Sequence, residues 1–507
     1  MQKSVIEYLQ STVSRFPAKI AVKDSEMSIT FGDLWRNAQK ISAALVNMNI
    51  GLNNPIGVYI PKGGKMIESF AGINMSGNFY VPLDTKSPVS RVSSIIKTLE
   101  SKVLITDRSH IETLRDFTHV QILVAEDIIE GDINIENAFS QFTHQIDTDP
   151  AYSIFTSGST GIPKGVVVSH RGVIDYIDWA KDTFHFMSDA VIGNQAPFYF
   201  DNSTLDIYLM YSTGATLNII PESNFAFPAK LVDYLNEEKI TFVFWVPFVL
   251  INVANLNIFE TKKPIYMKDV FFAGEVMPNK HLNYWRKHLP NCRYANLYGP
   301  TEITVDCTFY EVKREFSDSE PLPIGFPCRN SDVLILVDRK RRAAKGEQGE
   351  QGELCVRGSS LALGSYNSPQ KTASAFIQNP LHNYYPETIY CTGDVVYENE
   401  YGEIMYVGRV DSQIKHNGYR IELGEIETAI LGSHMVDSCC VVYDFANKKI
   451  VMFYQATEEL DMATFRKVIS ASIPRYMQPT VYHHIRELQR NTNGKIDRLF
   501  YNNQVNG

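Results

Sequence analysis

The sequence lacks the cysteine pattern of a zinc site and of a disulfide framework. Its seven cysteines are scattered, odd in number and without C-x-x-C spacing. It also has no uninterrupted apolar segment that approaches the roughly 20 residues of a membrane helix. The net charge is −9, and the one basic run, residues 339–342, is short and stands close to a Gly-rich turn. We therefore expect a cytoplasmic protein without a membrane or nucleic-acid partner.

The length and the patterning predict several structural units. A chain of 507 residues is too long for one ordinary core. Strand-like apolar runs alternate with helical segments, which is typical of α/β layers around a largely parallel sheet. Between about residues 323 and 406 the runs shorten and glycine-rich turns separate them, which predicts a small β-rich subdomain. We assign residues 1–410 to a large N-terminal α/β domain and residues 411–507 to a small α+β domain.

A loop rich in Gly, Ser and Thr at residues 156–165 is the first candidate site. It reads Thr-Ser-Gly-Ser-Thr-Gly-Ile-Pro-Lys-Gly between two strand-like runs. Its uncovered backbone N–H groups suit an anion such as phosphate, and Lys164 adds a positive charge. The loop is not a Walker A motif, because Pro163 and Gly165 stand where that motif needs Gly and Ser or Thr. Taken alone, the loop could equally be a surface turn.

Four further motifs follow the loop along the chain. They are Ala273-Gly-Glu275, Asn296-Leu-Tyr-Gly-Pro-Thr-Glu302, Tyr390-Cys-Thr-Gly-Asp394 and Asn491-Thr-Asn-Gly-Lys-Ile-Asp-Arg498. In this order they resemble the adenylate-forming enzymes, the superfamily of acyl-CoA synthetases, luciferases and the adenylation domains of non-ribosomal peptide synthetases. The resemblance covers nearly the whole chain, and it is closest to free-standing amino-acid adenylating enzymes of the D-alanine–carrier-protein ligase kind. It implies ATP and Mg²⁺ as cofactors and a mobile C-terminal domain with its hinge at Asp411.

The resemblance also assigns roles to individual residues. Tyr298 is expected to stack on adenine, and Asp394 is expected to bind both ribose hydroxyls. In the expected catalytic set, Thr301 touches the α-phosphate, Glu302 holds Mg²⁺, and Lys495 bridges the substrate carboxylate and the α-phosphate. The full expected nucleotide-binding set is Thr156, Ser157, Gly158, Ser159, Thr160, Gly161, Lys164, Ala273, Gly274, Glu275, Asn296, Leu297, Tyr298, Gly299, Thr301, Asp394 and Arg409.

Asp201 bears on the substrate class. Amino-acid adenylating members of the superfamily carry an Asp at this position, where it pairs with the α-ammonium of the substrate. At about 4 Å and an effective dielectric constant near 20, such a pair has a Coulomb energy on the order of 4 kcal/mol before desolvation. An enzyme for fatty or aryl acids has no reason to bury an unpaired carboxylate there. The alternative is that Asp201, like Ser203, caps the helix that follows.

The same alignment outlines the substrate pocket. Its expected lining is Asp201, Asn202, Leu205, Phe248, Phe271, Ala273, Leu297, Val305 and Asp306. Bulky aromatic rings fill space that a large substrate would need, so we expect a small amino acid. Proline is a rival, and small hydroxylated or diamino acids come next. Asp306 is discordant, because a carboxylate facing an apolar side chain is costly unless it is hydrogen-bonded or solvated.

Together these features predict an ATP-dependent ligase. It would activate a small amino acid as aminoacyl-AMP, release pyrophosphate, and transfer the aminoacyl group to the phosphopantetheine thiol of a separate carrier protein. The alternatives are an acyl-CoA ligase, an enzyme that passes aminoacyl-AMP directly to an amine, and an inactive nucleotide-binding scaffold. Asp201 opposes the first alternative, and the joint presence of Lys164, Glu302, Asp394 and Lys495 opposes the last.

Overall fold

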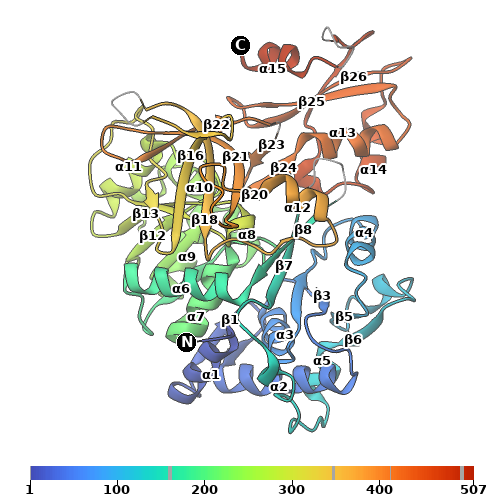
Figure 1. Cartoon of the computed structure of the whole chain (residues 1–507), viewed down its shortest axis with the longest axis vertical. Helices are drawn as coiled ribbons and strands as arrows, with labels where there is room; N and C mark the ends of the chain where they lie inside the picture. Colours follow the sequence, from blue (N-terminus) through green and yellow to red (C-terminus); the bar gives the residue numbers. More distant parts are fainter. Residues whose placement is uncertain (1, 158–162, 345–348, 412, 491–495) are drawn as a thin grey trace. The chain divides into compact units, whose positions relative to one another are not determined.

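The computed structural model describes residues 2–157, 163–344, 349–411, 413–490 and 496–507 (Figure 1). The chain divides into two compact units. The first unit comprises Met1–Leu83, Leu99–Ile154 and Gly165–Val410, and the second comprises Asp84–Thr98, Phe155–Lys164 and Asp411–Gly507. None of the helices in these described ranges is long and apolar enough to span a membrane.

Two mostly parallel sheets form the layers of the first unit. Over the described residues, the larger sheet has nine strands in the order β15-β14-β13-β12-β11-β9-β10-β1-β2. The smaller has seven strands there, in the order β19-β8-β7-β4-β3-β5-β6. The strands of the larger sheet are β1 (Ile20–Lys23), β2 (Ser28–Thr30), β9 (Val191–Asn194), β10 (Thr216–Ile219), β11 (Phe242–Trp245), β12 (Asp269–Phe272), β13 (Arg293–Tyr298), β14 (Thr308–Glu311) and β15 (Phe326–Pro327). Those of the smaller sheet are β3 (Pro55–Tyr59), β4 (Phe79–Pro82), β5 (Val103–Thr106), β6 (Gln121–Val124), β7 (Pro150–Thr156), β8 (Lys164–Ser169) and β19 (Gly364–Ser365).

Helices cover the faces of these sheets. The helices of the first unit are α1 (Ile6–Arg15), α2 (Phe31–Asn47), α3 (Gly64–Met75), α5 (Ala125–Glu130), α6 (His170–Phe184), α7 (Ser203–Thr213), α8 (Glu222–Phe225), α9 (Pro228–Glu237), α10 (Pro247–Asn255), α11 (Asn279–His288) and α12 (Pro369–Ala375). One large apolar core contains side chains from both sheets and from α1, α2, α3, α6 and α7. A second core joins α9, α10 and α11 to the larger sheet.

The local sequence explains where these elements begin and why they are buried. Thr30 accepts a hydrogen bond from the Asp33 N–H at the start of α2, and Ser169 caps α6 in the same way through the Gly172 N–H. All four residues of β11 are buried, as expected for a central parallel strand whose two faces are both covered.

A smaller antiparallel sheet completes the first unit. Its order over the described residues is β17-β16-β18-β21-β20, and β22 also pairs with β21. The bounds are β16 (Ser331–Val337), β17 (Arg341–Arg342), β18 (Gly352–Gly358), β20 (Phe376–Gln378), β21 (Thr388–Glu398) and β22 (Ile404–Arg409). Figure 1 shows β16, β18 and β21 side by side in yellow to orange. The strand β15 pairs with β14, so residues 326–327 belong to the nine-stranded sheet instead.

The second unit has its own small core. It contains α4 (Val89–Leu99), the hairpin β23 (Gln413–His416) and β24 (Tyr419–Glu422), α13 (Leu423–Gly432), β25 (Ser438–Asp444), β26 (Lys449–Gln455), α14 (Met462–Ile469), β27 (Val481–His484) and α15 (Arg498–Asn506). In this unit β26 pairs with β25 on one side and β27 on the other. A buried ion pair between Arg91 and Glu425 joins α4 to α13.

Candidate active site

The candidate residues of the first unit follow the carboxyl ends of parallel strands. Asp201 comes after β9, Phe248 after β11, Ala273 directly after β12, and Tyr298 ends β13. These four strands are neighbours in the nine-stranded sheet and run parallel to one another. In open α/β sheets, ligands bind outside the carboxyl ends of the strands. This edge of the sheet is therefore where a substrate is expected.

Asp201 lies close to two buried tyrosines. Burial above all raises the pKa of Tyr152 and of Tyr176, and the negative charge of Asp201 contributes to both shifts. Thr204 donates a hydrogen bond to the Tyr152 hydroxyl at 3.3 Å. The residue at the N-cap of α7 is Asn202, and no side-chain capping bond is present there. The N-cap position itself is thus occupied by Asn202, one residue after Asp201.

Asp306 has a defined partner. The Tyr176 hydroxyl, from α6, donates to Oδ2 of Asp306 at 2.6 Å, and both side chains are buried. Burial and then the charge of Asp306 raise the pKa of Tyr176 well above its ordinary value, so the phenol stays protonated and donates. This hydrogen bond gives the Asp306 carboxylate the buried partner that it would lack against an apolar substrate side chain. Nothing in the local sequence around either residue indicated the pairing, because 130 positions separate them.

The turn between β13 and β14 is tightly built. Thr304 and Val305 have φ angles of 56° and 74°, a region that β-branched residues rarely occupy. A Cβ on Gly299 would lie 2.3 Å from the carbonyl oxygen of Val305 and 2.6 Å from Cα of Asp306. Only glycine allows this approach, so Gly299 lets the chain fold back and bring Asp306 beside Tyr176. Such strain concentrates at functional sites.

A second cluster links the nine-stranded sheet to the antiparallel sheet. Asp394 of β21 is directly opposite Arg409 of β22, and Nη1 of Arg409 lies 2.8 Å from Oδ1 of Asp394. The other carboxylate oxygen accepts a hydrogen bond from the Tyr298 hydroxyl. The side chains of Asp394 and Arg409 are only 3% and 10% exposed. Each carboxylate oxygen keeps a further lone pair, so Asp394 can still accept a ligand hydroxyl.

Further predicted nucleotide residues also belong to the first unit. Thr301 and Glu302 are in the short 3-10 helix η4 (Thr301–Ile303), directly after the turn that ends β13, and both are buried. The Asn296 amide donates to the carbonyl of Pro323 at 2.8 Å. Gly274 has a φ of +94°, which suits close approach of the main chain to a flat ring.

The predicted pocket residues do not all share one environment. The large core contains Leu205, Phe271, Ala273, Leu297 and Val305 together. Phe248 instead packs against the second core, the one that joins α9, α10 and α11 to the sheet.

The side-chain amide of Asn202 has a donor that no described residue satisfies. Its Nδ2 is buried and has no hydrogen-bond partner among the residues that the structure describes. A buried donor without an acceptor is costly, and a substrate oxygen would relieve that cost.

The other predicted residues belong to the second unit. Ser157 Oγ donates to the carbonyl of Arg420 at 2.7 Å and accepts from the Glu422 N–H at 3.2 Å, so it contacts the backbone of β24. Oγ1 of Thr156 is buried and has no partner within the described ranges. Lys164 begins β8, and Asp411 accepts a hydrogen bond from the Gln413 N–H at 3.2 Å. The predicted residues Gly158, Ser159, Thr160, Gly161 and Lys495 lie outside the described residues.

Comparison with known proteins identifies the family. A model described as "AMP-binding enzyme" matches residues 9–366, which is more than half of the chain. The chain belongs to the AMP-binding enzyme family. It is 31% identical to the L-proline–[L-prolyl-carrier protein] ligase of Pseudomonas fluorescens, over all of both chains. It is 30% identical to the D-alanine–D-alanyl carrier protein ligase of Bacillus licheniformis, over 97% of this chain and 98% of that one.

Solved structures agree on the fold of this AMP-binding enzyme. The adenylation domain AlmE of Vibrio cholerae, solved with glycyl-adenosine-5′-phosphate, matches with a TM-score of 0.84 at 19% identity, over all of this chain and 98% of that one. The expected mixed α/β fold and the expected adenylate-forming ligase family are thereby confirmed. Some curated relatives are large synthases, of which the chain spans less than half the length.

Proposed function

We propose that this adenylate-forming enzyme activates a small amino acid. The carboxylate of the amino acid attacks the α-phosphorus of ATP, which gives aminoacyl-AMP and pyrophosphate. The aminoacyl group then passes to the phosphopantetheine thiol of a separate carrier protein. Relatives with full-length coverage are named as ligases of prolyl and D-alanyl carrier proteins, which supports both steps.

The position of Asp201 carries the amino-acid part of the proposal. Its carboxylate follows the carboxyl end of β9 and lies within electrostatic range of Tyr152 and Tyr176. We assign it to the substrate α-ammonium. The buried Asn202 Nδ2 would donate to a substrate oxygen, since it has no acceptor among the described residues. Phe271 and Leu297 close the apolar side and favour a small side chain.

The nucleotide is assigned to the neighbouring cluster. Asp394 would accept from the ribose hydroxyls, Tyr298 would stack on adenine, and Arg409 would hold the ribose–phosphate end. Glu302 is fully buried and offers a carboxylate of the kind that Mg²⁺ uses together with phosphate oxygens and water. The metal would neutralise phosphate charge, while Thr301 beside Glu302 would orient the α-phosphate.

The second step is assigned to a movement of residues 411–507 about Asp411. The division of the chain into compact units between Val410 and Asp411 supports this assignment. Hinges are a few residues at element ends that absorb large changes in φ and ψ. The hydrogen bonds of Ser157 with the backbone of β24 support a coupling between the proposed phosphate loop and the segment that we assign to thiol transfer.

The test is the substitution Asp201→Asn, which removes the charge and keeps the shape. Loss of a hydrogen bond to a charged group, about 1.5–3 kcal/mol, should raise the KM for the amino acid roughly 10- to 100-fold. The Kd for ATP, measured directly, should stay unchanged. Asp189→Asn is the matched control, because the Asp189 side chain is 72% exposed. Wild-type KM in Asp201→Asn, or activity with a fatty acid and coenzyme A in place of an amino acid and a carrier, would overturn the proposal.

A further inference from the structure

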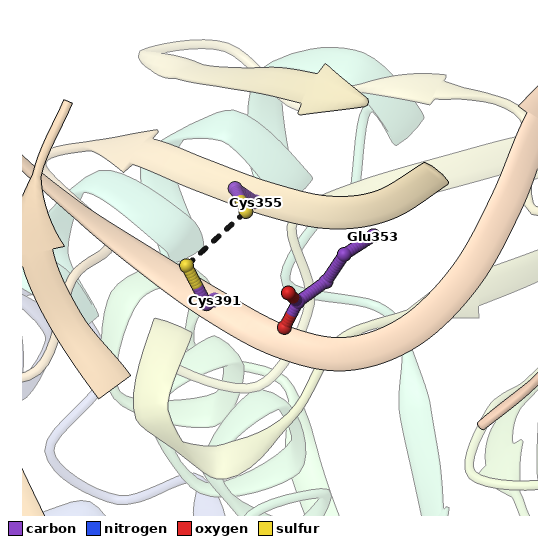
Figure 2. Close-up of side chains that lie close together, drawn as sticks. All are labelled: Glu353, Cys355 and Cys391. Carbon is purple, nitrogen blue, oxygen red and sulfur yellow. Dashed lines mark hydrogen bonds between the residues drawn. The ribbon is translucent and has the colours of Figure 1, made fainter. Parts of the chain in front are cut away.

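Cys355 and Cys391 form a thiol pair that sequence spacing does not reveal. They are directly opposite each other on the antiparallel strands β18 and β21. The Cys355 thiol donates a hydrogen bond to Sγ of Cys391 at 3.3 Å, as Figure 2 shows with a dashed line. Directly opposite residues of an antiparallel pair have Cα atoms about 4.5–5.5 Å apart, which lies within the range of disulfides. A bond between the two sulfurs therefore needs them to approach by only roughly 1 Å, since S–S bonds are about 2.05 Å long.

The two thiols are buried next to an ion pair that is partly exposed. Cys355 is fully buried and Cys391 is 4% exposed, in an apolar cluster with Leu334, Leu336 and Ile389. Beside the thiols, Glu353 forms a two-point ion pair with Arg339, whose side chain is 42% exposed.

The two thiols are not equivalent. The hydrogen bond from Cys355 lowers the pKa of Cys391, and the positive charge of Arg339 also lowers it. The same contact raises the pKa of Cys355, because Cys355 is the donor. We therefore assign Cys391, the acceptor of this hydrogen bond, as the attacking sulfur, because the thiolate is the reactive form of cysteine.

Glu353 is the third group of this cluster and is already engaged. Its carboxylate and the two sulfurs lie within 4.8 Å of one another, a spacing that could also hold a metal ion. However, Arg339 binds both of its oxygens, and the Gly393 N–H donates to Oε1 at 2.9 Å. Both lone pairs of Oε1 are thus used, and a cation at Oε2 would lie beside the positive charge of Arg339, whereas a disulfide leaves that ion pair intact. The contacts thus favour oxidation over metal binding.

The thiol pair is directly connected to the candidate ribose site. Cys391 is three residues before Asp394 on β21. Between them, the Thr392 hydroxyl donates to the carbonyl of Leu354 at 2.8 Å and accepts from the Asp394 N–H at 3.0 Å. A change in the spacing of β18 and β21 at the thiol pair therefore reaches the backbone that holds Asp394.

We propose that Cys355 and Cys391 are a modification site, at which a hydroperoxide forms an intramolecular disulfide that weakens nucleotide binding at Asp394. The Cys391 thiolate attacks one oxygen of hydrogen peroxide, giving a sulfenic acid and hydroxide, and the hydroxide takes up a proton as water. The Cys355 sulfur then attacks the Cys391 sulfur, and the sulfenic hydroxyl leaves with the Cys355 proton as a second water. Two thiols lose two electrons, and one peroxide gains them. The small size of the oxidant suits a buried site.

The experiment treats the purified full chain with hydrogen peroxide and maps its peptides by mass spectrometry. The expected product is a peptide pair linked through Cys355 and Cys391, which dithiothreitol separates. Its formation should raise the Kd for ATP about tenfold, the loss expected for one hydrogen bond to a charged group, and reduction should restore it. The Kd is measured by calorimetry without an amino acid. The effect on ATP rests on the proposed ribose role of Asp394, but the linked peptides form whether or not the chain activates amino acids.

Two variants make the result decisive. In Cys355→Ala, Cys391 has no resolving thiol, so peroxide should leave a sulfenic acid there that dimedone labels. Cys292→Ser is the matched control, because Cys292 is half-buried and its thiol bonds the Met267 carbonyl; this variant should still form the linked pair. Absence of the linked pair at peroxide doses that oxidise Cys292 in the wild type would overturn the proposal. So would a linked pair that leaves the Kd for ATP unchanged, or cadmium binding through both thiolates with no linked pair after peroxide.

Discussion

The substitution Asp394→Asn separates the structural role of Asp394 from its proposed role in binding ribose. The wild-type carboxylate holds Arg409 at 2.8 Å and accepts from the Tyr298 hydroxyl. At that distance and an effective dielectric constant of 20, the Coulomb energy of the pair is about 6 kcal/mol before desolvation. Asparagine keeps the shape and one acceptor oxygen but loses the charge. It removes one negative charge that faces the 10%-exposed Arg409, so we expect the free energy of unfolding to fall by about 3 kcal/mol, the lower end for a broken buried pair.

The same substitution should weaken nucleotide binding separately. Loss of a charged acceptor for the ribose hydroxyls should raise the Kd for ATP roughly 10- to 100-fold, with a smaller change for a nucleotide that lacks the 2′-hydroxyl. Calorimetry at a temperature where the variant is folded measures the Kd, and urea unfolding measures the stability. Tyr298→Phe is the matched control, since it removes one hydrogen bond to Asp394 and keeps both the charge and Arg409. A folded Asp394→Asn that binds ATP with wild-type affinity would refute the ribose assignment.

Three further predictions concern the core, the pocket and the chemistry. Burial lowers the pKa of His170 to about 3. Below pH 6.5, the ordinary pKa of histidine, His170 therefore binds a proton in the unfolded chain but not in the folded chain. Urea unfolding should show that the free energy of unfolding falls by about 2 kcal/mol from pH 7 to pH 5, a fall that is absent in His170→Gln. Phe271 is fully buried against Phe184 and Phe242. The substitution Phe271→Ala should lower the free energy of unfolding by about 3–5 kcal/mol and let larger amino acids support exchange. An unchanged substrate range would show that Phe271 does not line the pocket. Lys495→Ala should lower aminoacyl-AMP formation by orders of magnitude and spare transfer from preformed adenylate to a carrier thiol; equal losses in both steps would contradict its charge-neutralising role.

The strands were predictable because a strand is indicated by the residue types of one short, continuous run. The run 242–246 is apolar and β-branched or aromatic, and it forms β11 almost residue for residue. The strand-like run that follows the loop, residues 166–170, shows the limit of this local signal, since its last residue, His170, is the first residue of α6. Ser169 is the cap that divides the two elements, and a capping serine also fits within a strand pattern.

The contacts that build the site were less predictable, because they join distant parts of the chain. The motif around Tyr298 and the motif around Asp394 were each visible, but their hydrogen bond spans two different sheets. Tyr176 occupies an ordinary buried position of α6, so nothing marked it as the partner of Asp306. The pairing of Cys355 with Cys391 depends on the register of β18 and β21, which no spacing rule for cysteines contains.

The most direct test of the central claim is ATP–pyrophosphate exchange by the wild-type enzyme with matched substrates. The panel contains the L- and D-forms of alanine and serine, together with glycine and L-proline, and each is compared with the same acid lacking its α-amino group. Because Asp201 is assigned to the α-ammonium, exchange should depend on at least one small amino acid and fall by roughly 100-fold or more with its deaminated counterpart. Equal exchange with propionate and alanine, or exchange with fatty acids alone, would contradict the claim that this enzyme activates amino acids.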